Sequence, residues 1–216
     1  MRTYRWCLPA AAVLLLTGCG GGAEGGSAED RATALTKEQV GEVLPDDEAM
    51  AGWKESARPI AVEMDALYRR EACPMKGNAG CENSRFFGVS TFHDKDDAVQ
   101  VNFLIIAYVG EQAAREAYDV LWDGRYAKRA GEKAKPLGLG PVGDERDARL
   151  GSFSYKGALG AVTQVRVGTT LLWTEAISAG EGGGVDGDSV RDLAAVLAER
   201  SRQAQNGDAP SAVLGG

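Results

Sequence analysis

The chain has 216 residues, a formal net charge of −7 at pH 7 and 44% hydrophobic residues. This length and composition are enough for one domain with a sizeable core. Because the chain is acidic, charge excludes nucleic acids and anionic membrane surfaces as partners.

The first eighteen residues have the regions of an export signal. Basic Arg2 and Arg5 precede an apolar run over residues 8–16, which as a helix would span about 14 Å at ~1.5 Å per residue. A bilayer core is about 30 Å thick, so the run is too short to cross it and is typical of a signal peptide. We predict that residues 1–18 are removed on export, which leaves 22 basic and 31 acidic residues and a net charge of −9.

The apolar run ends on Leu16-Thr17-Gly18-Cys19, which resembles the lipobox of bacterial lipoproteins. In that family the small residues admit the peptidase and the cysteine thiol is alkylated by a diacylglycerol. The resemblance implies a mature chain that starts at lipid-modified Cys19, anchored to the cell membrane on its extracytoplasmic face. The alternative is an ordinary signal peptide followed by a chance cysteine.

Composition divides the rest of the chain into a tether, a domain and a tail. Residues 19–33 are rich in glycine and lack apolar periodicity, which predicts a flexible tether. Residues 205–216 predict a disordered tail, so a single domain is expected over 34–204.

Cys73 and Cys81 are predicted to form a disulfide, because an exported chain meets an oxidising compartment. The seven residues between them are rich in turn formers, and closing so short a loop stabilises the fold by about 2.5 kcal/mol. The competing interpretation is a zinc site. It needs four ligands, and the chain has one histidine.

The first half of the domain gives one helix and two strands. Thr36 and Gln39 form a capping box, and Pro45 ends the helix that they start. Residues 60–72 are ambiguous between helix and extended chain. Residues 86–92 and the alternating run over 99–107 predict strands joined by a polar turn at residues 94–97.

The second half gives two long helices and three strands. An apolar stripe predicts a helix over 111–127, and Ser189 with Asp192 signals the start of a last one. Strands are expected over 148–155, 161–167 and 169–176, although Gly168 could mark a bulge in one longer strand. Short turns imply antiparallel pairing. The predicted fold is α+β, a twisted antiparallel sheet of about five or more strands with the two main helices packed on one face.

No residue set in the sequence supports catalysis, a metal or a cofactor. Gly138-Leu139-Gly140-Pro141-Val142-Gly143 matches a dinucleotide-binding pattern, but the strand before it and the helix after it are missing. Asp94, Asp96 and Asp97 do not have the spacing of a calcium loop, and we expect a solvated turn there. His93 is the only histidine and lies at a predicted strand end, without a nucleophile motif in the chain.

Five large aromatic residues have core packing as their default role. If a ligand cleft lies between sheet and helices, they are also the residues expected to line it: Trp53, Tyr118, Trp122, Tyr155 and Trp173.

Five short motifs in the middle and end of the chain carry a resemblance: Leu35-Thr36-Lys37-Glu38, Gly52-Trp53, the Cys73/Cys81 region, Gly143-Asp144-Glu145 and Val165-Arg166-Val167-Gly168. The resemblance is to a broad group of actinobacterial lipoproteins, which are similar to the extracellular sensor domain of PknH-type receptor kinases. It implies a twisted antiparallel sheet backed by two helices, with a cleft for an unknown ligand and no catalytic activity. The sensor domain of these kinases is expected to have two disulfides, and here one is predicted. The chain has no kinase domain, so a signal would pass through a partner.

The leading hypothesis is a non-enzymatic, membrane-tethered module that binds a small apolar or envelope-derived ligand, or docks on a membrane protein. A deep, apolar cleft would favour a ligand, and a well-filled fold would favour a protein. The second hypothesis is an envelope hydrolase whose carboxylates converge only in the fold, which requires two buried acids in one pocket. The third is a structural lipoprotein.

Overall fold

A computed structural model describes residues 32–152, 158–178 and 185–215. The predicted signal peptide, Cys19 and most of the tether lie outside the described residues. Within them, no helix is long and apolar enough to cross a bilayer.

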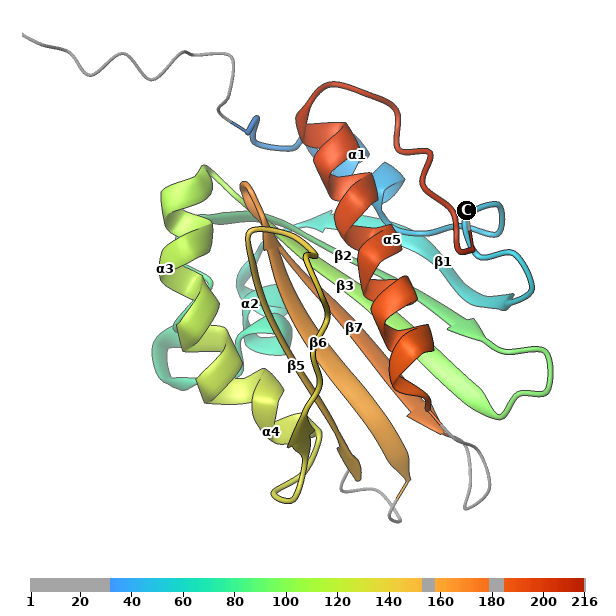
Figure 1. The fold of residues 1–216 in the computed structure, drawn as a ribbon. Coiled ribbons are helices and arrows are strands. Elements are labelled where there is room, and N and C mark those ends of the chain that lie inside the picture. Colours follow the sequence, from blue (N-terminus) through green and yellow to red (C-terminus); the bar gives the residue numbers. More distant parts are fainter. Residues whose placement is uncertain (1–31, 153–157, 179–184, 216) are drawn as a thin grey trace, which may run out of the picture. The chain divides into compact units, whose positions relative to one another are not determined.

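One antiparallel sheet of seven strands, in the order β1-β2-β3-β7-β6-β5-β4, forms the centre of the fold (Figure 1). The α+β class is confirmed, and the sheet is larger than the predicted minimum of five strands. The strands are β1 (Lys54–Glu63), β2 (Ser84–His93), β3 (Val99–Tyr108), β4 (Lys135–Pro136), β5 (Glu145–Ser152), β6 (Leu159–Val167) and β7 (Thr170–Ser178).

Two tight turns set the register of the central strands. Between β2 and β3, the Asp94 carboxylate accepts hydrogen bonds from the backbone N–H groups of Ala98 (2.6 Å) and Val99 (3.1 Å). Between β6 and β7, Gly168 has a φ of +49°, a conformation that glycine adopts without strain. Residues 159–178 therefore form a hairpin, not one bulged strand.

The helices are α1 (Lys37–Val43), α2 (Ala66–Ala72), α3 (Glu111–Leu121), α4 (Ala127–Arg129) and α5 (Gly187–Gln205), with a 3₁₀ turn at Lys76–Asn78 and a π-turn at Trp122–Tyr126. The predicted capping box of Thr36 and Gln39 is confirmed. The ambiguous segment 60–72 contains the end of β1 and then α2, which Asp65 caps. α5 begins earlier than predicted, because Asp186, not Ser189, accepts the N–H groups of its first turn.

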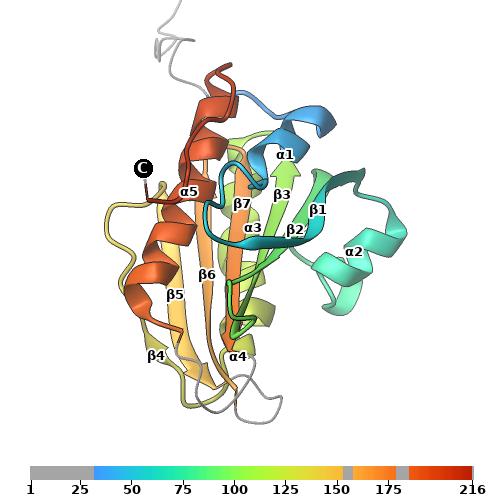
Figure 2. The same cartoon turned by 90° about the vertical axis from the view of Figure 1, so that its right-hand side faces the viewer.

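The two main helices lie on opposite faces of the sheet, so the prediction that they share one face was wrong (Figure 2). α5 packs with α1 against one face, and α3 packs against the other. The reason lies in β6 and β7, where every residue from 160 to 176 is buried. Strands that are buried on both faces need a covering layer on each side.

Residues 206–215 differ from the predicted disordered tail, because buried Arg200 ties them to the domain. Its guanidinium donates to the carbonyl oxygens of Glu42 (2.8 Å), Val43 (3.0 Å) and Ala212 (3.2 Å). The Leu214 N–H also donates to the carbonyl of Ala49 (2.8 Å). Composition alone suggested fraying, but these long-range bonds hold the segment on the α5 face.

The predicted disulfide between Cys73 and Cys81 is confirmed. It closes a loop that packs tightly on α3: a Cβ added at Gly80 would lie 2.6 Å from Cγ of Leu121. The Tyr108 hydroxyl donates to the carbonyl of Gly80 at 2.7 Å. The loop is therefore fixed to both the sheet and a helix.

Candidate functional site

The face of the sheet under α3 is incompletely covered. α3 contacts β3, β6 and β7, and Tyr68 of α2 packs against Phe87 near the start of β2, but further along β1, β2 and β3 apolar side chains remain exposed or partly exposed. Val89 on β2 and Leu104 on β3 are partly exposed there, and Ile60 on β1 is 55% exposed. Their positions pair directly across the strands, so their side chains share a face. We call this surface the open half-face.

A polar row borders the open half-face. Thr91, Asn102 and Glu175 are successive register partners on β2, β3 and β7. The amide oxygen of Asn102 accepts hydrogen bonds from the Thr91 hydroxyl and from the side-chain amide of Gln100, both at 3.0 Å. The row therefore runs across the sheet from the half-buried Thr91 on β2 to the buried carboxylate of Glu175 on β7.

Glu175 is the buried end of this row, with a side chain only 2% exposed. One carboxylate oxygen, Oε2, lies 2.8 Å from the Arg129 guanidinium of α4. Burial raises the pKa of Glu175 because it disfavours the charged form, and the charges of Arg129 and Arg125 oppose that rise. Burial and the two arginines therefore act on the pKa of this carboxyl group in opposite directions, and the effect of burial is the larger.

Two buried polar atoms at this site have no hydrogen-bond partner among the described residues. They are Oε1 of Glu175 and Nε of Arg125. Leaving a buried donor or acceptor unpaired costs about 1–3 kcal/mol. Such groups are available to a molecule that supplies the missing partner.

A cavity of about 270 Å³ lies one row further along the strands. It is lined by His93, Asp97, Gln100, Ile177 and Ser178. His93, Gln100 and Ile177 are again register partners on β2, β3 and β7, two residues along each strand from the polar row. The open half-face, the polar row and this cavity together form the candidate site.

The π-turn brings the arginines to Glu175. Tyr126 in this turn stacks on buried Trp173, with ring centroids 4.4 Å apart, and Arg125 precedes it. Gly124 lets Met75 of the disulfide loop approach, since a Cβ there would lie 2.1 Å from the Met75 sulfur. π-turns are rare and occur often at functional sites. The sequence predicted this segment as ordinary helix.

The aromatic residues proposed for a cleft do not come together as one group. Tyr118, Trp122 and Trp173 pack together in the core under α3. Trp53 lies on the other face, beside a cavity of about 170 Å³ at the start of α5. Tyr155 lies outside the described residues.

The side-chain polar groups of Trp173 and Tyr118 already have hydrogen-bond partners. Trp173 Nε1 donates to Gln164 Oε1 (2.9 Å), and Gln164 Nε2 donates to the Tyr118 carbonyl (2.8 Å). The Tyr118 hydroxyl donates to Asp147 (3.0 Å). Their arrangement is that of a hydrogen-bonded core network.

Among the other residues that the sequence singled out, His93 ends β2 and lines the cavity. Asp94 caps its turn, and residues 138–143 form a loop between β4 and β5. Within the described part of the chain, no group of three or more His, Cys, Asp or Glu side chains is placed to hold a metal.

Sequence reasoning missed Glu175. Its signal is a lone carboxylate inside the apolar run Leu171-Leu172-Trp173-Thr174-Glu175-Ala176-Ile177. Acidic residues are almost never fully buried unless they are paired, so a carboxylate in such a run predicts a cationic partner.

No protein-family model matches the sequence, and no curated protein matches it significantly. A search of solved structures finds the crystal structure of the extracellular domain of PknH from Mycobacterium tuberculosis. The match has a TM-score of 0.52 and 12% sequence identity, and it covers 82% of this chain and all of the other. The predicted likeness is therefore confirmed at the level of the fold: the chain is similar in fold to the extracellular domain of that kinase.

Proposed function

We propose that this protein is a membrane-anchored, extracytoplasmic, sensor-like module that binds a small ligand at the open half-face without chemical turnover. Lipid-modified Cys19 would hold it at the membrane. The observation that carries the proposal is the buried Glu175 Oε1, which has no hydrogen-bond partner among the described residues and lies at the inner end of the open half-face, beside a cavity.

The chemistry of the site favours a small ligand that is partly apolar. Val89, Leu104 and Ile177 offer apolar surface, while Glu175 and Asn102 offer polar contacts. Binding sites commonly combine an apolar lining with a few placed polar groups. The cavity of about 270 Å³ is just below the usual range of ~300–1,000 Å³, so the open half-face must supply part of the contact.

The buried charges favour binding over hydrolysis. A pair of converging carboxylates would support the hydrolase hypothesis. Glu175 is the only carboxylate among the buried polar residues that the structure describes. Its charged partners are Arg129 and Arg125, which hold the carboxylate in place and do not form a carboxylate pair with it.

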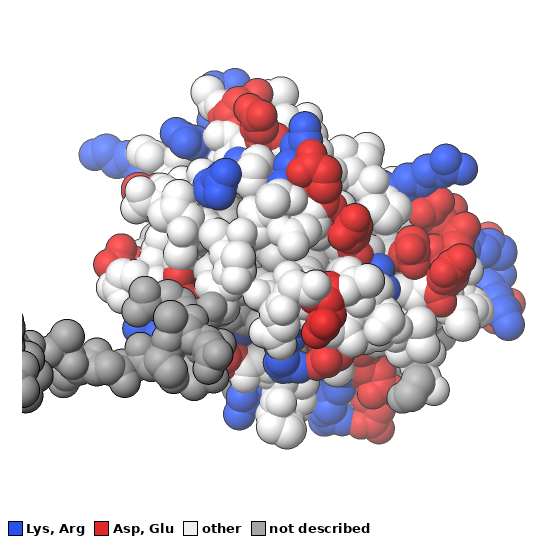
Figure 3. Space-filling model, turned by 90° about the horizontal axis from the view of Figure 1, so that it is seen from above, with Lys and Arg blue, Asp and Glu red and all other residues white. Residues whose placement is uncertain are grey.

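The surface charge favours anchoring by lipid. On the face shown in Figure 3, Lys and Arg side chains lie among acidic and uncharged ones, without a continuous basic patch. Two acyl chains give durable membrane attachment without such a patch. The fold likeness to the extracellular domain of a receptor kinase supports a sensor-like role outside the cytoplasm.

Native mass spectrometry of the chain purified from its own host tests both parts of the proposal. We expect an intact mass that begins at Cys19 with a lipid adduct, and a further small molecule retained without covalent attachment. Leu104→Trp fills the open half-face and should abolish retention. Val213 lies outside this surface and is 42% exposed. Val213→Trp is therefore the matched control and should still retain the ligand.

Circular dichroism checks that both variants fold. Ligand retained by the Leu104→Trp variant, or no ligand in any variant, would overturn the binding part. An unmodified mature N-terminus would overturn the anchoring part.

A further inference from the structure

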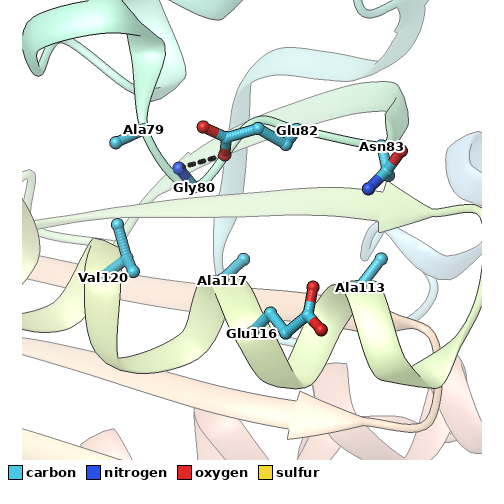
Figure 4. Close-up of a pocket in the computed structure, with 8 residues that line it drawn as sticks. All are labelled: Ala79, Gly80, Glu82, Asn83, Ala113, Glu116, Ala117 and Val120. Carbon is cyan, nitrogen blue, oxygen red and sulfur yellow. Dashed lines mark hydrogen bonds between the residues drawn. The ribbon is translucent and has the colours of Figure 1, made fainter.

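A second surface feature lies on α3, at the groove between this helix and the disulfide loop. The groove has a volume of about 190 Å³. Figure 4 shows Ala113, Ala117 and Val120 on its helical side, facing the segment 79–83. Small side chains on the helix leave a channel with an apolar floor.

The groove is built from rigid elements. Gly80 has a φ of +88° and packs against Leu121, and its carbonyl accepts the Tyr108 hydroxyl. The disulfide between Cys73 and Cys81 closes the loop that forms the other wall. A preformed groove lowers the entropy cost of binding.

One carboxylate stands on each wall. Glu82 Oε2 accepts the Gly80 N–H at 2.6 Å, which fixes this side chain along the loop. Glu116 Oε1 accepts the side-chain amide of Gln112 at 2.8 Å. Both side chains keep a second oxygen for another donor. Among the described residues, no Lys, Arg or His nitrogen lies within 4.0 Å of either carboxylate.

We propose that this groove docks a lysine side chain of a partner protein. The unbranched methylenes of lysine would lie on the alanine floor, and its ammonium group would reach the carboxylates of Glu82 and Glu116. An ammonium group has three donors and no acceptor, which suits two acceptors on opposite walls.

The size of the groove favours a single side chain over a free ligand. Small-molecule pockets usually enclose about 300–1,000 Å³, well above the volume found here. Val120 on the rim is apolar but 40% exposed. It can contact the surface of the partner protein around the inserted lysine. An anchor residue in a pocket, surrounded by apolar contact, is typical of protein interfaces.

Methyl NMR of the full-length chain in detergent, with labelled alanines, tests this proposal. The probe is N-acetyl-lysine methylamide, and the norleucine analogue is its uncharged counterpart. We expect the lysine probe to shift the methyl signals of Ala113 and Ala117. The norleucine probe should reach the same shift only at about tenfold higher concentration.

The double variant Glu82→Gln/Glu116→Gln should weaken lysine binding about tenfold. The matched control Asp119→Asn removes an exposed carboxylate from the same helix outside the groove and should leave binding unchanged. Equal affinity for the norleucine probe would assign the groove to an apolar side chain and overturn the proposal. Equal effects of the double variant and the control would overturn it as well, and neither outcome depends on ligand binding at the open half-face.

Discussion

The two faces of the sheet are built differently, although the same strands make both. On the α5 face, Val101, Phe103 and Ile105 of β3 are fully buried under apolar side chains of α1 and α5. On the α3 face, the alternate residues Asn102 and Leu104 are partly exposed, and a buried polar network runs beneath the helix. One face is sealed, and the other is polar and half open.

This difference separates stability from binding within one sheet. The apolar face packed under α1 and α5 contributes strongly to the burial that holds the domain together. The other face can then tolerate two features that cost stability: a Glu175 oxygen without a hydrogen-bond partner in the described part of the chain, and apolar side chains on β1, β2 and β3 that are exposed or partly exposed. Substitutions on the two faces should therefore change the free energy of unfolding by different amounts.

Neighbouring residues on β3 test the comparison with the largest expected effect. Ile105→Ala, on the sealed face, should lower the free energy of unfolding by about 3 kcal/mol, because it leaves a cavity among Val40, Leu44 and Gly88. Leu104→Ala, on the open half-face, should cost about 1 kcal/mol or less, because its side chain is already partly solvated. Urea unfolding measures both. Equal losses would contradict the assignment of a sealed and an open face.

The buried network should give an intermediate effect. Gln164→Leu keeps the side-chain size but leaves the Trp173 indole N–H and the Tyr118 carbonyl without this partner. We expect a loss of about 2 kcal/mol in unfolding free energy, measured by urea titration. Gln112→Leu, an exposed glutamine of α3, is the control and should stay within about 0.5 kcal/mol of the wild type. A neutral Gln164→Leu would mean that the network adds nothing to stability.

The smallest expected effect is the contribution of Glu175 to the pH dependence of the unfolding free energy. Its pKa is raised in the folded state, so the folded chain binds more protons than the unfolded chain between the unfolded and the folded pKa. Stability is then lost as the pH rises through that window. Glu175→Gln removes this loss, so its stability relative to the wild type should increase from acidic to neutral pH. Urea midpoints across that range measure the difference, and a constant difference would refute the raised pKa.

Much of the fold could be predicted, because local patterns determine it. The capping box at Thr36, the strand alternation over 99–107 and the stripe of α3 depend on neighbours in sequence, and the structure has all three elements. The face that each helix covers was not predictable in this way. It depends on the strand order, which places β7 and β6 between β3 and β5.

The candidate site could not be predicted from local patterns. Glu175 meets Asn102 only through the register of β3 with β7, and it meets Arg129 only because the π-turn redirects the end of α3. In the sequence, Arg125 and Arg129 look like solvent-exposed charges on a helix. Contacts between residues this far apart in sequence leave no periodic signal.

The attachment of Thr33 has a mechanical consequence for the domain. Its N–H donates to the Gln205 carbonyl at the end of α5 (3.4 Å), and its carbonyl accepts the Thr169 hydroxyl in the β6–β7 turn (3.4 Å). The preceding Ala32 N–H donates to Glu111 at the start of α3 (3.0 Å). A pulling force applied ahead of residue 32 therefore enters the domain at two helix ends and at the central hairpin. Strands β6 and β7 are hydrogen-bonded on both sides, so this load is shared across the sheet, whereas a force on β1 would peel away an edge strand.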